Sequence, residues 1–336
     1  CADENGITLT CSDGSLSIES TLTAEVKEIG RVVLPGKLFT ELVRKLPGGS
    51  VTIKVGDNHA ASIRCMSSRS NLAGMNAMEY PEMAEVSSGV AVQIQQNRLR
   101  DMISRVVFAI AVDETRQILT GCLLEVSPDE ARLVALDGYR LAMQKLFQPF
   151  QLPEGTENLR AVIPGRVLNE LSKILPEDET FCTLLFDKNR MQANFGNTRL
   201  STVLLAGEFI DYRKILPPSF KTMAKANRTE VLNAIDRASL MAREGKNNLI
   251  RMSFEQDKLS ISSYAEMGDV LEEVNVSLTG DPLEIAFNAK YLSDVIRNVT
   301  DEELCMKFNS NVSPCVFCPT EGDQYLYLIL PVRVFQ

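Results

Sequence analysis

The chain has little of what common enzyme chemistry requires. Its single histidine, His59, falls in the turn of an expected hairpin with no nucleophile motif beside it, and we interpret it as a turn residue. Neither G-x-x-x-x-G-K-[ST] nor G-x-G-x-x-G occurs, which argues against nucleotide hydrolysis and dinucleotide binding. The neighbouring acids Asp301, Glu302 and Glu303 lie in a solvated turn after an expected helix. We therefore predict no catalytic residue, no cofactor and no enzymatic activity.

Long apolar runs and a cysteine framework are also missing. No apolar run approaches the roughly 20 residues of a membrane span, so we expect no membrane partner. The 8 cysteines lack framework spacing, which is typical of reduced thiols in a cytoplasmic protein. The C-x-x-C of Cys315 and Cys318 has strand-like neighbours, so its thiols would point to opposite faces of a strand. We expect neither a metal site nor redox chemistry from this motif.

One helix pattern is present three times. Its copies align on Pro35, Pro164 and Asn288, at a domain-scale spacing rather than the short period of a solenoid. They are VLPGKLFTELVRKLP at 33–47, VIPGRVLNELSKILP at 162–176 and AFNAKYLSDVIRNVT at 286–300. The pattern predicts three similar modules.

Basic residues recur at fixed positions of this helix pattern. Each copy carries two cations two helical turns apart, on the face opposite its apolar stripe, and these are Lys37 and Arg44, Arg166 and Lys173, and Lys290 and Arg297. An acid lies between each pair, at Glu41, Glu170 and Asp294. A ladder of surface ion pairs would explain one such helix. Recurrence in three copies favours equivalent helices that present cations to one shared partner.

A second helix pattern relates residues 97–110 to 229–242 and aligns Arg105 with Arg237. Each module is therefore expected to hold two helices. The matching helix of the first module would fall before residue 1, so we expect that module to be incomplete at its N-terminal side.

Between the helices the sequence alternates as strands with tight turns. The hairpin patterns cover residues 7–19, 51–65, 123–144 and 252–266. Hairpins with few helices predict an α+β fold with antiparallel sheets and helices on one face. We place the modules at residues 1–86, 87–216 and 217–336, with seams at the interrupted stretches 85–90 and 216–227.

The overall charge is acidic although the repeated helices are basic. A formal net charge of -9 speaks against a simple nucleic-acid binder. A few basic helix faces on an otherwise acidic protein fit a partner that the protein encircles rather than binds tightly through many contacts. A few phosphate contacts, with acids close by, would permit sliding.

Four dispersed segments carry a family resemblance over the whole chain. They are LVALDGYRLAM at 133–143, GEFIDYRKILP at 207–217, FNAKYLSDVI at 287–296 and LYLILPVRV at 326–334. With the three modules, the chain resembles the bacterial DNA polymerase III β subunit, the sliding clamp, without the N-terminal part of its first domain. The resemblance implies a DNA clamp fold and a homodimeric ring of six similar domains. It also implies a non-catalytic processivity factor that encircles double-stranded DNA.

The resemblance further implies three groups of site residues. The DNA-facing cations would be Lys37, Arg44, Arg105, Arg166, Lys173, Arg237, Lys290 and Arg297. Short linear peptides of the polymerase α subunit and the clamp loader would dock in a pocket formed by Leu119, Gly138, Tyr139, Arg140, Leu141, Lys214, Ile215, Asn288, Tyr291, Val312, Pro314, Leu328, Ile329, Leu330, Pro331, Val332 and Arg333. Plain core packing is an equal reading for Leu141, Val312 and Leu328. The dimer contact would involve Leu72 and Met241.

Two other functions stay open at this point. One is a multi-domain hydrolase whose acids only look structural, and the other is a scaffold of repeated domains that binds no DNA. A clamp differs from both because it has no turnover, needs a second chain to close its ring, and retains circular DNA better than linear DNA.

Overall fold

The computed structural model describes residues 1–155, 157–245 and 248–333. Its chain forms two compact units, one of residues 1–89 and 182–203 and one of residues 90–181 and 204–336. The division differs from the predicted module boundaries because the strands of residues 182–203 continue the sheet of the first unit.

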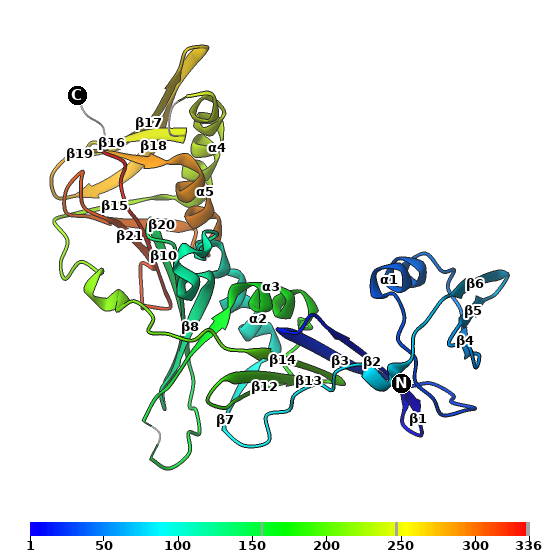
Figure 1. Cartoon of the computed structure of the whole chain (residues 1–336). Coiled ribbons are helices and arrows are strands. Elements are labelled where there is room, and N and C mark those ends of the chain that lie inside the picture. Colours follow the sequence, from blue (N-terminus) through cyan, green and yellow to red (C-terminus); the bar gives the residue numbers. More distant parts are fainter. Residues whose placement is uncertain (156, 246–247, 334–336) are drawn as a thin grey trace. The chain divides into compact units, whose positions relative to one another are not determined.

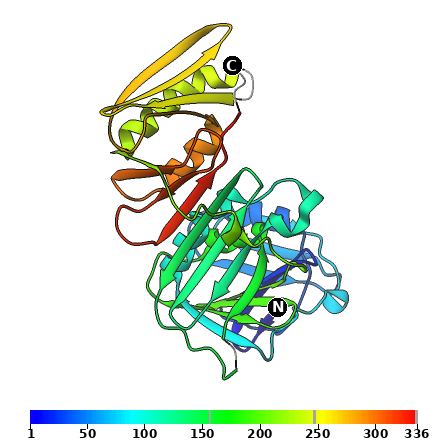
Figure 2. The same ribbon diagram turned by 90° about the vertical axis from the view of Figure 1, so that its left-hand side faces the viewer.

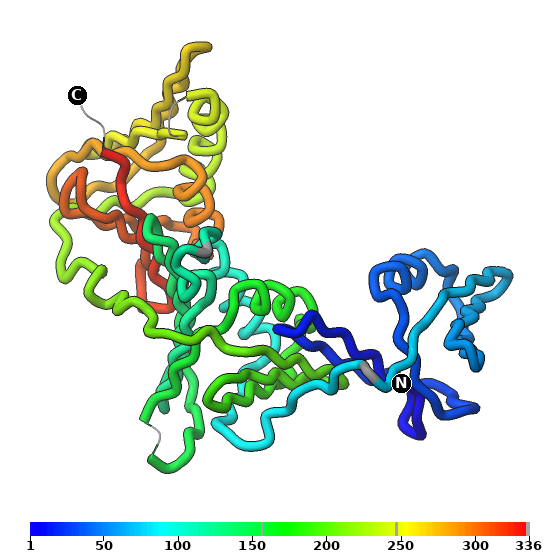
Figure 3. Tube along the Cα trace, viewed as in Figure 1, coloured from blue at the N-terminus to red at the C-terminus, as the bar shows by residue number. Residues whose placement is uncertain are grey.

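The first unit contains two antiparallel sheets. One has the order β1-β2-β3-β14-β13-β12, so that the N-terminal hairpin lies beside strands from the middle of the chain (Figure 3). Its strands are β1 (Ala2–Asp3), β2 (Gly6–Ser12), β3 (Leu16–Leu22), β12 (Phe181–Phe186), β13 (Arg190–Phe195) and β14 (Thr198–Val203). The other sheet consists of β4 (Val51–Val55), β5 (Ala61–Cys65) and β6 (Ser68–Leu72).

Local chemistry explains the predicted hairpins of this unit. Asp13 Oδ1 accepts hydrogen bonds from the backbone N–H of Ser15 at 3.0 Å and of Leu16 at 2.9 Å. Gly14 adopts a φ of 90°, which favours glycine. His59, at a φ of 61°, lies in the β4–β5 turn, as the sequence predicts.

The helix of the first unit is unusual in burying none of its residues. This helix, α1 (Gly36–Arg44), exposes 51% of Leu38 and 42% of Val43, although its predicted apolar stripe includes both. A short helix, η1 (Ala77–Glu79), follows β6. The stripe of α1 therefore lacks the covering that its two counterparts have in the second unit.

A single twelve-stranded antiparallel sheet runs through the second unit, in the order β11-β8-β9-β10-β22-β21-β20-β15-β18-β17-β16-β19 (Figure 2). Its strands are β8 (Gly121–Val126), β9 (Glu130–Leu136), β10 (Arg140–Phe147), β11 (Leu159–Pro164), β15 (Thr222–Asn227), β16 (Leu249–Phe254), β17 (Lys258–Ala265), β18 (Gly268–Thr279), β19 (Leu283–Asn288), β20 (Glu303–Phe308), β21 (Cys315–Cys318) and β22 (Tyr325–Ile329). The strand β7 (Val90–Gln95) begins the unit.

Two helix pairs accompany this sheet (Figure 1). They are α2 (Gln96–Ser104) with α3 (Gly165–Ile174), and α4 (Arg228–Glu244) with α5 (Ala289–Asn298). Short helices lie at η2 (Val107–Ala109), η3 (Glu114–Thr120) and η4 (Tyr212–Lys214). The repeated pattern begins its helix one residue after each anchor, and α3 and α5 bury the apolar stripes that the pattern predicts.

The second and third modules meet through backbone pairing. β10 pairs with β22 over five positions, from Arg140 opposite Ile329 to Gln144 opposite Tyr325. This junction positions the residues of the candidate peptide site.

Candidate nucleic-acid and peptide interfaces

The repeated helices place three predicted cations around one open cavity of about 950 Å³. Arg166 and Lys173 come from α3 and Lys290 from α5, and all three are exposed. The cavity is also lined by Glu170 and Asp294. The structure thus brings the basic faces of the second and third modules to a common surface. Lys37 and Arg44 are exposed on α1 in the other unit.

Four of the predicted cations form ion pairs, and the pair of Lys173 with Glu170 lies within a repeated helix, as the ladder interpretation expects. The four pairs are Arg105 with Asp101 at 3.2 Å, Lys173 with Glu170 at 2.8 Å, Arg237 with Glu272 at 2.5 Å and Arg297 with Asp236 at 2.8 Å. The Arg237 guanidinium holds the pKa of the Glu272 carboxyl below its usual value. Ion pairing therefore accounts for part of the charge pattern, and contact of these cations with DNA stays a prediction.

Asp294, unlike Glu170, forms its ion pair outside its own helix. It accepts a hydrogen bond at 2.6 Å from Arg140, which lies on β10 in the preceding module. Arg140 is 8% exposed, also contacts Asp137 at 3.0 Å, and has its guanidinium 5.3 Å from the ring centre of Phe108 and 4.6 Å from that of Tyr291. The predicted pocket residue Arg140 is thus a buried link between two modules.

The candidate peptide site contains a row of four apolar side chains. Leu136, Leu141, Leu328 and Val316 lie directly opposite one another on the adjacent strands β9, β10, β22 and β21. Direct opposition places all four on one face of the sheet. We call these four residues the apolar row. Leu119, another predicted pocket residue, belongs to the same buried cluster.

Burial separates the predicted pocket residues into floor and rim. Leu141 and Leu328 are 1% and 2% exposed, so core packing describes them, whereas Val312 is 58% exposed and is not core. Ile215 and Leu330 are each 38% exposed. We call the buried residues the floor and the exposed residues the rim of the predicted pocket, and contact of the rim with a partner stays a prediction.

Other predicted pocket residues hold the backbone in place. Asn288 caps α5 by accepting hydrogen bonds from the N–H groups of Lys290 and Tyr291, and Gly138 takes a φ of 92° in the β9–β10 turn. Tyr139 stacks on Tyr291 with ring centres 5.8 Å apart. The carbonyl of Tyr139 accepts a 2.8 Å hydrogen bond from Leu330 N–H, and that of Ala286 accepts one of 2.8 Å from Val332 N–H.

The remaining predicted pocket residues lie at the surface or in the sheet. Lys214 is exposed and pairs with Asp211 at 3.2 Å, while Ile329 is fully buried on β22. Pro314, Pro331 and Arg333 are partly or fully exposed, and Val334, the last residue of the matching terminal segment, lies outside the described residues.

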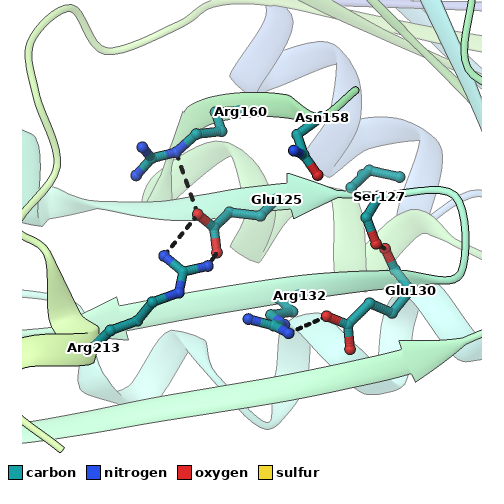
Figure 4. Close-up of a pocket in the computed structure, with 8 residues that line it drawn as sticks. Glu125, Ser127, Glu130, Arg132, Asn158, Arg160 and Arg213 are labelled. Carbon is teal, nitrogen blue, oxygen red and sulfur yellow. Dashed lines mark hydrogen bonds and ion pairs between the residues drawn. The ribbon is translucent and has the colours of Figure 1, made fainter. Parts of the chain in front are cut away.

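The segment 212–215, which carries Lys214 and Ile215, is held by side chains around a polar pocket of about 430 Å³ (Figure 4). Glu125 on β8 accepts hydrogen bonds from the Tyr212 hydroxyl and from Arg213, each at 2.7 Å, and pairs with Arg160 at 3.2 Å. Burial raises the pKa of the Tyr212 hydroxyl, which therefore stays a donor. The sequence did not predict these contacts, because Glu125 is far along the chain from Tyr212 and Arg213.

The predicted dimer residues differ in exposure. Leu72 ends β6, opposite Ala61, and is 7% exposed, so its side chain is largely covered within its own unit. Met241 lies on α4 and is partly exposed. Their contact with a second chain stays a prediction.

Within the described ranges, no group of three or more His, Cys, Asp or Glu side chains is arranged to hold a metal ion. Among the same residues, no helix has both the length and the apolar character needed to cross a membrane.

Comparison with known proteins identifies the family. Residues 1–84, 93–211 and 213–333 match the N-terminal, central and C-terminal domains of the DNA polymerase III beta subunit. The beta sliding clamp of Staphylococcus epidermidis is 35% identical over 344 residues, covering 99% of this chain and 90% of that protein. The chain belongs to the DNA polymerase III β sliding clamp family.

Solved structures of sliding clamps agree with this assignment. The DNA polymerase sliding clamp of Bacillus subtilis matches with a TM-score of 0.92 at 33% identity, covering 99% of this chain and 90% of that one. The DNA polymerase III beta subunit of Thermotoga maritima also matches with a TM-score of 0.92, at 27% identity and the same coverage. The DNA clamp fold predicted from the sequence is confirmed, and the sliding clamp family is one of non-catalytic processivity subunits.

Proposed function

We propose that two copies of this chain close into a ring around duplex DNA, in the cytoplasm, and tether the replicative polymerase to it. The observation that carries this proposal is the common basic surface of α3 and α5, where Arg166, Lys173 and Lys290 surround one cavity. Such cations contact the phosphate backbone without reading bases. The three modules at residues 1–86, 87–216 and 217–336, twice over, would make up the six domains of the ring.

Charge reversal tests the basic surface. The triple variant Arg166→Glu, Lys173→Glu and Lys290→Glu should lose retention on closed circular DNA after loading. Its matched control reverses Lys27, Lys54 and Lys188, three exposed lysines in the other unit. Log K falls with log salt, and each lost phosphate contact should make this negative slope shallower by about 0.9. Equal losses in both variants, or retention in the helix variant, would refute the assignment of this surface.

The ring itself has a direct measurement. Sedimentation at micromolar concentration should show a dimer, with circular DNA retained better than linear DNA. A monomer under these conditions would count against ring closure by this chain.

We further propose that the exposed residues of the predicted pocket bind short peptides of the polymerase α subunit and the clamp loader. Exposed Ile215, Val312 and Leu330 would take the apolar end of such a peptide, and Tyr139 and Arg333 its polar part. Burying two apolar side chains contributes about 1.5–3 kcal/mol each before ordering costs, so the Kd should be about micromolar. Modest affinity suits partners that exchange on one clamp.

A single substitution tests the peptide site. Leu330→Asp would place an unpaired charge among apolar groups and should abolish peptide binding measured by calorimetry. Leu9→Asp is the matched control, because Leu9 is 42% exposed on β2 of the other unit. Unchanged peptide affinity in Leu330→Asp would disprove the assignment.

A further inference from the structure

Two cysteines from different strands of the second unit face one another. Cys305 on β20 lies directly opposite Cys318 on β21. Cys315, the other member of the C-x-x-C motif, lies instead opposite Ile329 on β22 and is fully buried. The motif members do point to opposite faces, as the sequence predicts, and the partner of Cys318 comes from elsewhere in the chain.

The strand geometry is compatible with a bond between the two sulfur atoms. Directly opposite residues of antiparallel strands have Cα atoms about 4.5 or 5.5 Å apart, depending on their hydrogen-bonding position. Disulfides join Cα atoms about 4.4–6.8 Å apart. A Cys305–Cys318 disulfide therefore needs rotation of the two side chains and a small approach of the two strands, because opposite Cβ atoms lie about 4.5–5.5 Å apart and a disulfide brings them to about 3.5–4.5 Å.

The surroundings of this pair activate one sulfur and keep the other protonated. Cys305 is directly opposite Cys318, and Lys307 lies two residues after Cys305, on the same face of β20. The hydrogen bond from Cys305, with the Lys307 ammonium, lowers the pKa of Cys318, and the same hydrogen bond raises the pKa of Cys305. Asp301 opposes the effect on Cys318.

Other charged or titratable groups near the pair are Lys225, Glu321, Asp301 and Tyr325. Lys225 on β15, opposite Cys305, forms an ion pair with Glu303 at 3.1 Å. Tyr325 donates a 2.9 Å hydrogen bond to Asp301, and burial raises the pKa of its hydroxyl, so it is neutral. Lys307 is thus the cation that acts on Cys318 directly.

The thiol with the lowered pKa, Cys318, is also the more accessible of the two. Cys318 is half-buried at the end of β21, whereas Cys305 is 2% exposed. A small oxidant can reach Cys318, and Cys305 needs to reach only its neighbour.

We propose that Cys318 and Cys305 form a redox-active dithiol site for small hydroperoxides. The Cys318 thiolate attacks one peroxide oxygen, the O–O bond breaks, and Cys318 becomes a sulfenic acid while the other oxygen leaves as hydroxide or alkoxide and takes up a proton. The Cys305 sulfur then attacks the Cys318 sulfur, a disulfide forms, and water leaves with the Cys305 proton. Two thiols are oxidised and one peroxide is reduced.

Oxidation of the reduced chain, residues 1–336, tests the site. After treatment with hydrogen peroxide at pH 7, non-reducing peptide mapping by mass spectrometry should find the Cys305–Cys318 disulfide. Cys315→Ser should behave as wild type. Cys305→Ser should instead accumulate a sulfenic acid at Cys318 that dimedone traps, and Cys318→Ser should give neither product. Exposed Cys1 and Cys11 report that oxidant reached the protein.

A second measurement separates activation by Lys307 from mere proximity. The oxidation rate of Cys318 should rise through a midpoint below the roughly pH 8.5 of a free thiol. Lys307→Gln should move that midpoint upward, and a rise of one unit from about 6 lowers the thiolate fraction at pH 7 only about twofold, so the shift is read from the whole pH profile, while Lys307→Arg keeps the midpoint. Oxidised Cys1 or Cys11 without a Cys305–Cys318 disulfide, or a midpoint at or above that of a free thiol, would overturn the proposal.

Discussion

Removal of the Arg140 side chain should loosen the junction between the second and third modules. Arg140 is 8% exposed and bridges Asp137 on its own turn and Asp294 on α5, at 3.0 and 2.6 Å. Taking away one partner of a buried ion pair costs about 3–5 kcal/mol, because the remaining carboxylate keeps its desolvation cost without its cation. Arg140→Met keeps much of the volume and removes the charge.

Hydrogen exchange measures this effect where it occurs. The amides of β10 and β22 report opening of the junction, since these strands pair directly. Because about 1.4 kcal/mol corresponds to a factor of ten, exchange there should accelerate about a hundredfold or more. The variant Arg140→Met with Asp294→Asn should recover part of the loss, because the second change removes the uncompensated charge.

The control for Arg140→Met removes the cation of an ion pair that is exposed to solvent. Lys173 and Glu170 are 65% and 41% exposed in their side chains. Lys173→Met should therefore change exchange by about twofold or less. If Arg140→Met leaves the exchange of β10 and β22 within that range, Arg140 does not hold the junction.

Two further predictions follow from packing and from titration. Gly165→Ala should destabilise the chain by about 1–3 kcal/mol in thermal unfolding, since its Cβ would lie 2.4 Å from Ile110 Cδ1 and 2.8 Å from Thr120 O. Gly36→Ala, at the equivalent position of α1 with nothing within 4 Å, should be neutral or stabilising. Similar effects of the two substitutions would contradict the packing argument. Burial raises the pKa of Tyr327, so the folded state keeps a proton that the unfolded chain loses near about pH 10. The free energy that this proton contributes to folding is therefore complete below about pH 10 and is lost as the pH rises above it. Tyr327→Phe, which loses the 3.1 Å hydrogen bond to Asn298 O, should show a smaller drop in Tm from pH 8 to pH 11 than wild type, and an equal drop would contradict this assignment.

The elements with a local signal could be predicted from the sequence. The repeated helix pattern predicts α1, α3 and α5 because its apolar period, its cations and its anchors all agree, and Asp13 with Gly14 predicts the first hairpin. The predicted ranges run past the helices because apolar alternation continues into the strands before them, as with β11 before α3.

The candidate site depends on pairings that leave no local signal. Leu141 and Leu328 are opposite each other only because β10 pairs with β22, which comes from the far end of the chain. The family resemblance named both residues without distinguishing buried floor from exposed rim. Arg140 was assigned to the pocket for the same reason, and its burial between Phe108 and Tyr291 requires three segments to meet.

The unbroken sheet of the second unit also determines how that unit carries mechanical load. Antiparallel hydrogen bonds run perpendicular to the strands, so a force along β10 and β22 strains all of their bonds together, whereas a force across them would break the bonds one after another. Tension along these strands therefore loads the pair in its stronger direction. The spacing within the apolar row would stay constant under such a load, because it equals the distance of about 4.8 Å between neighbouring strands.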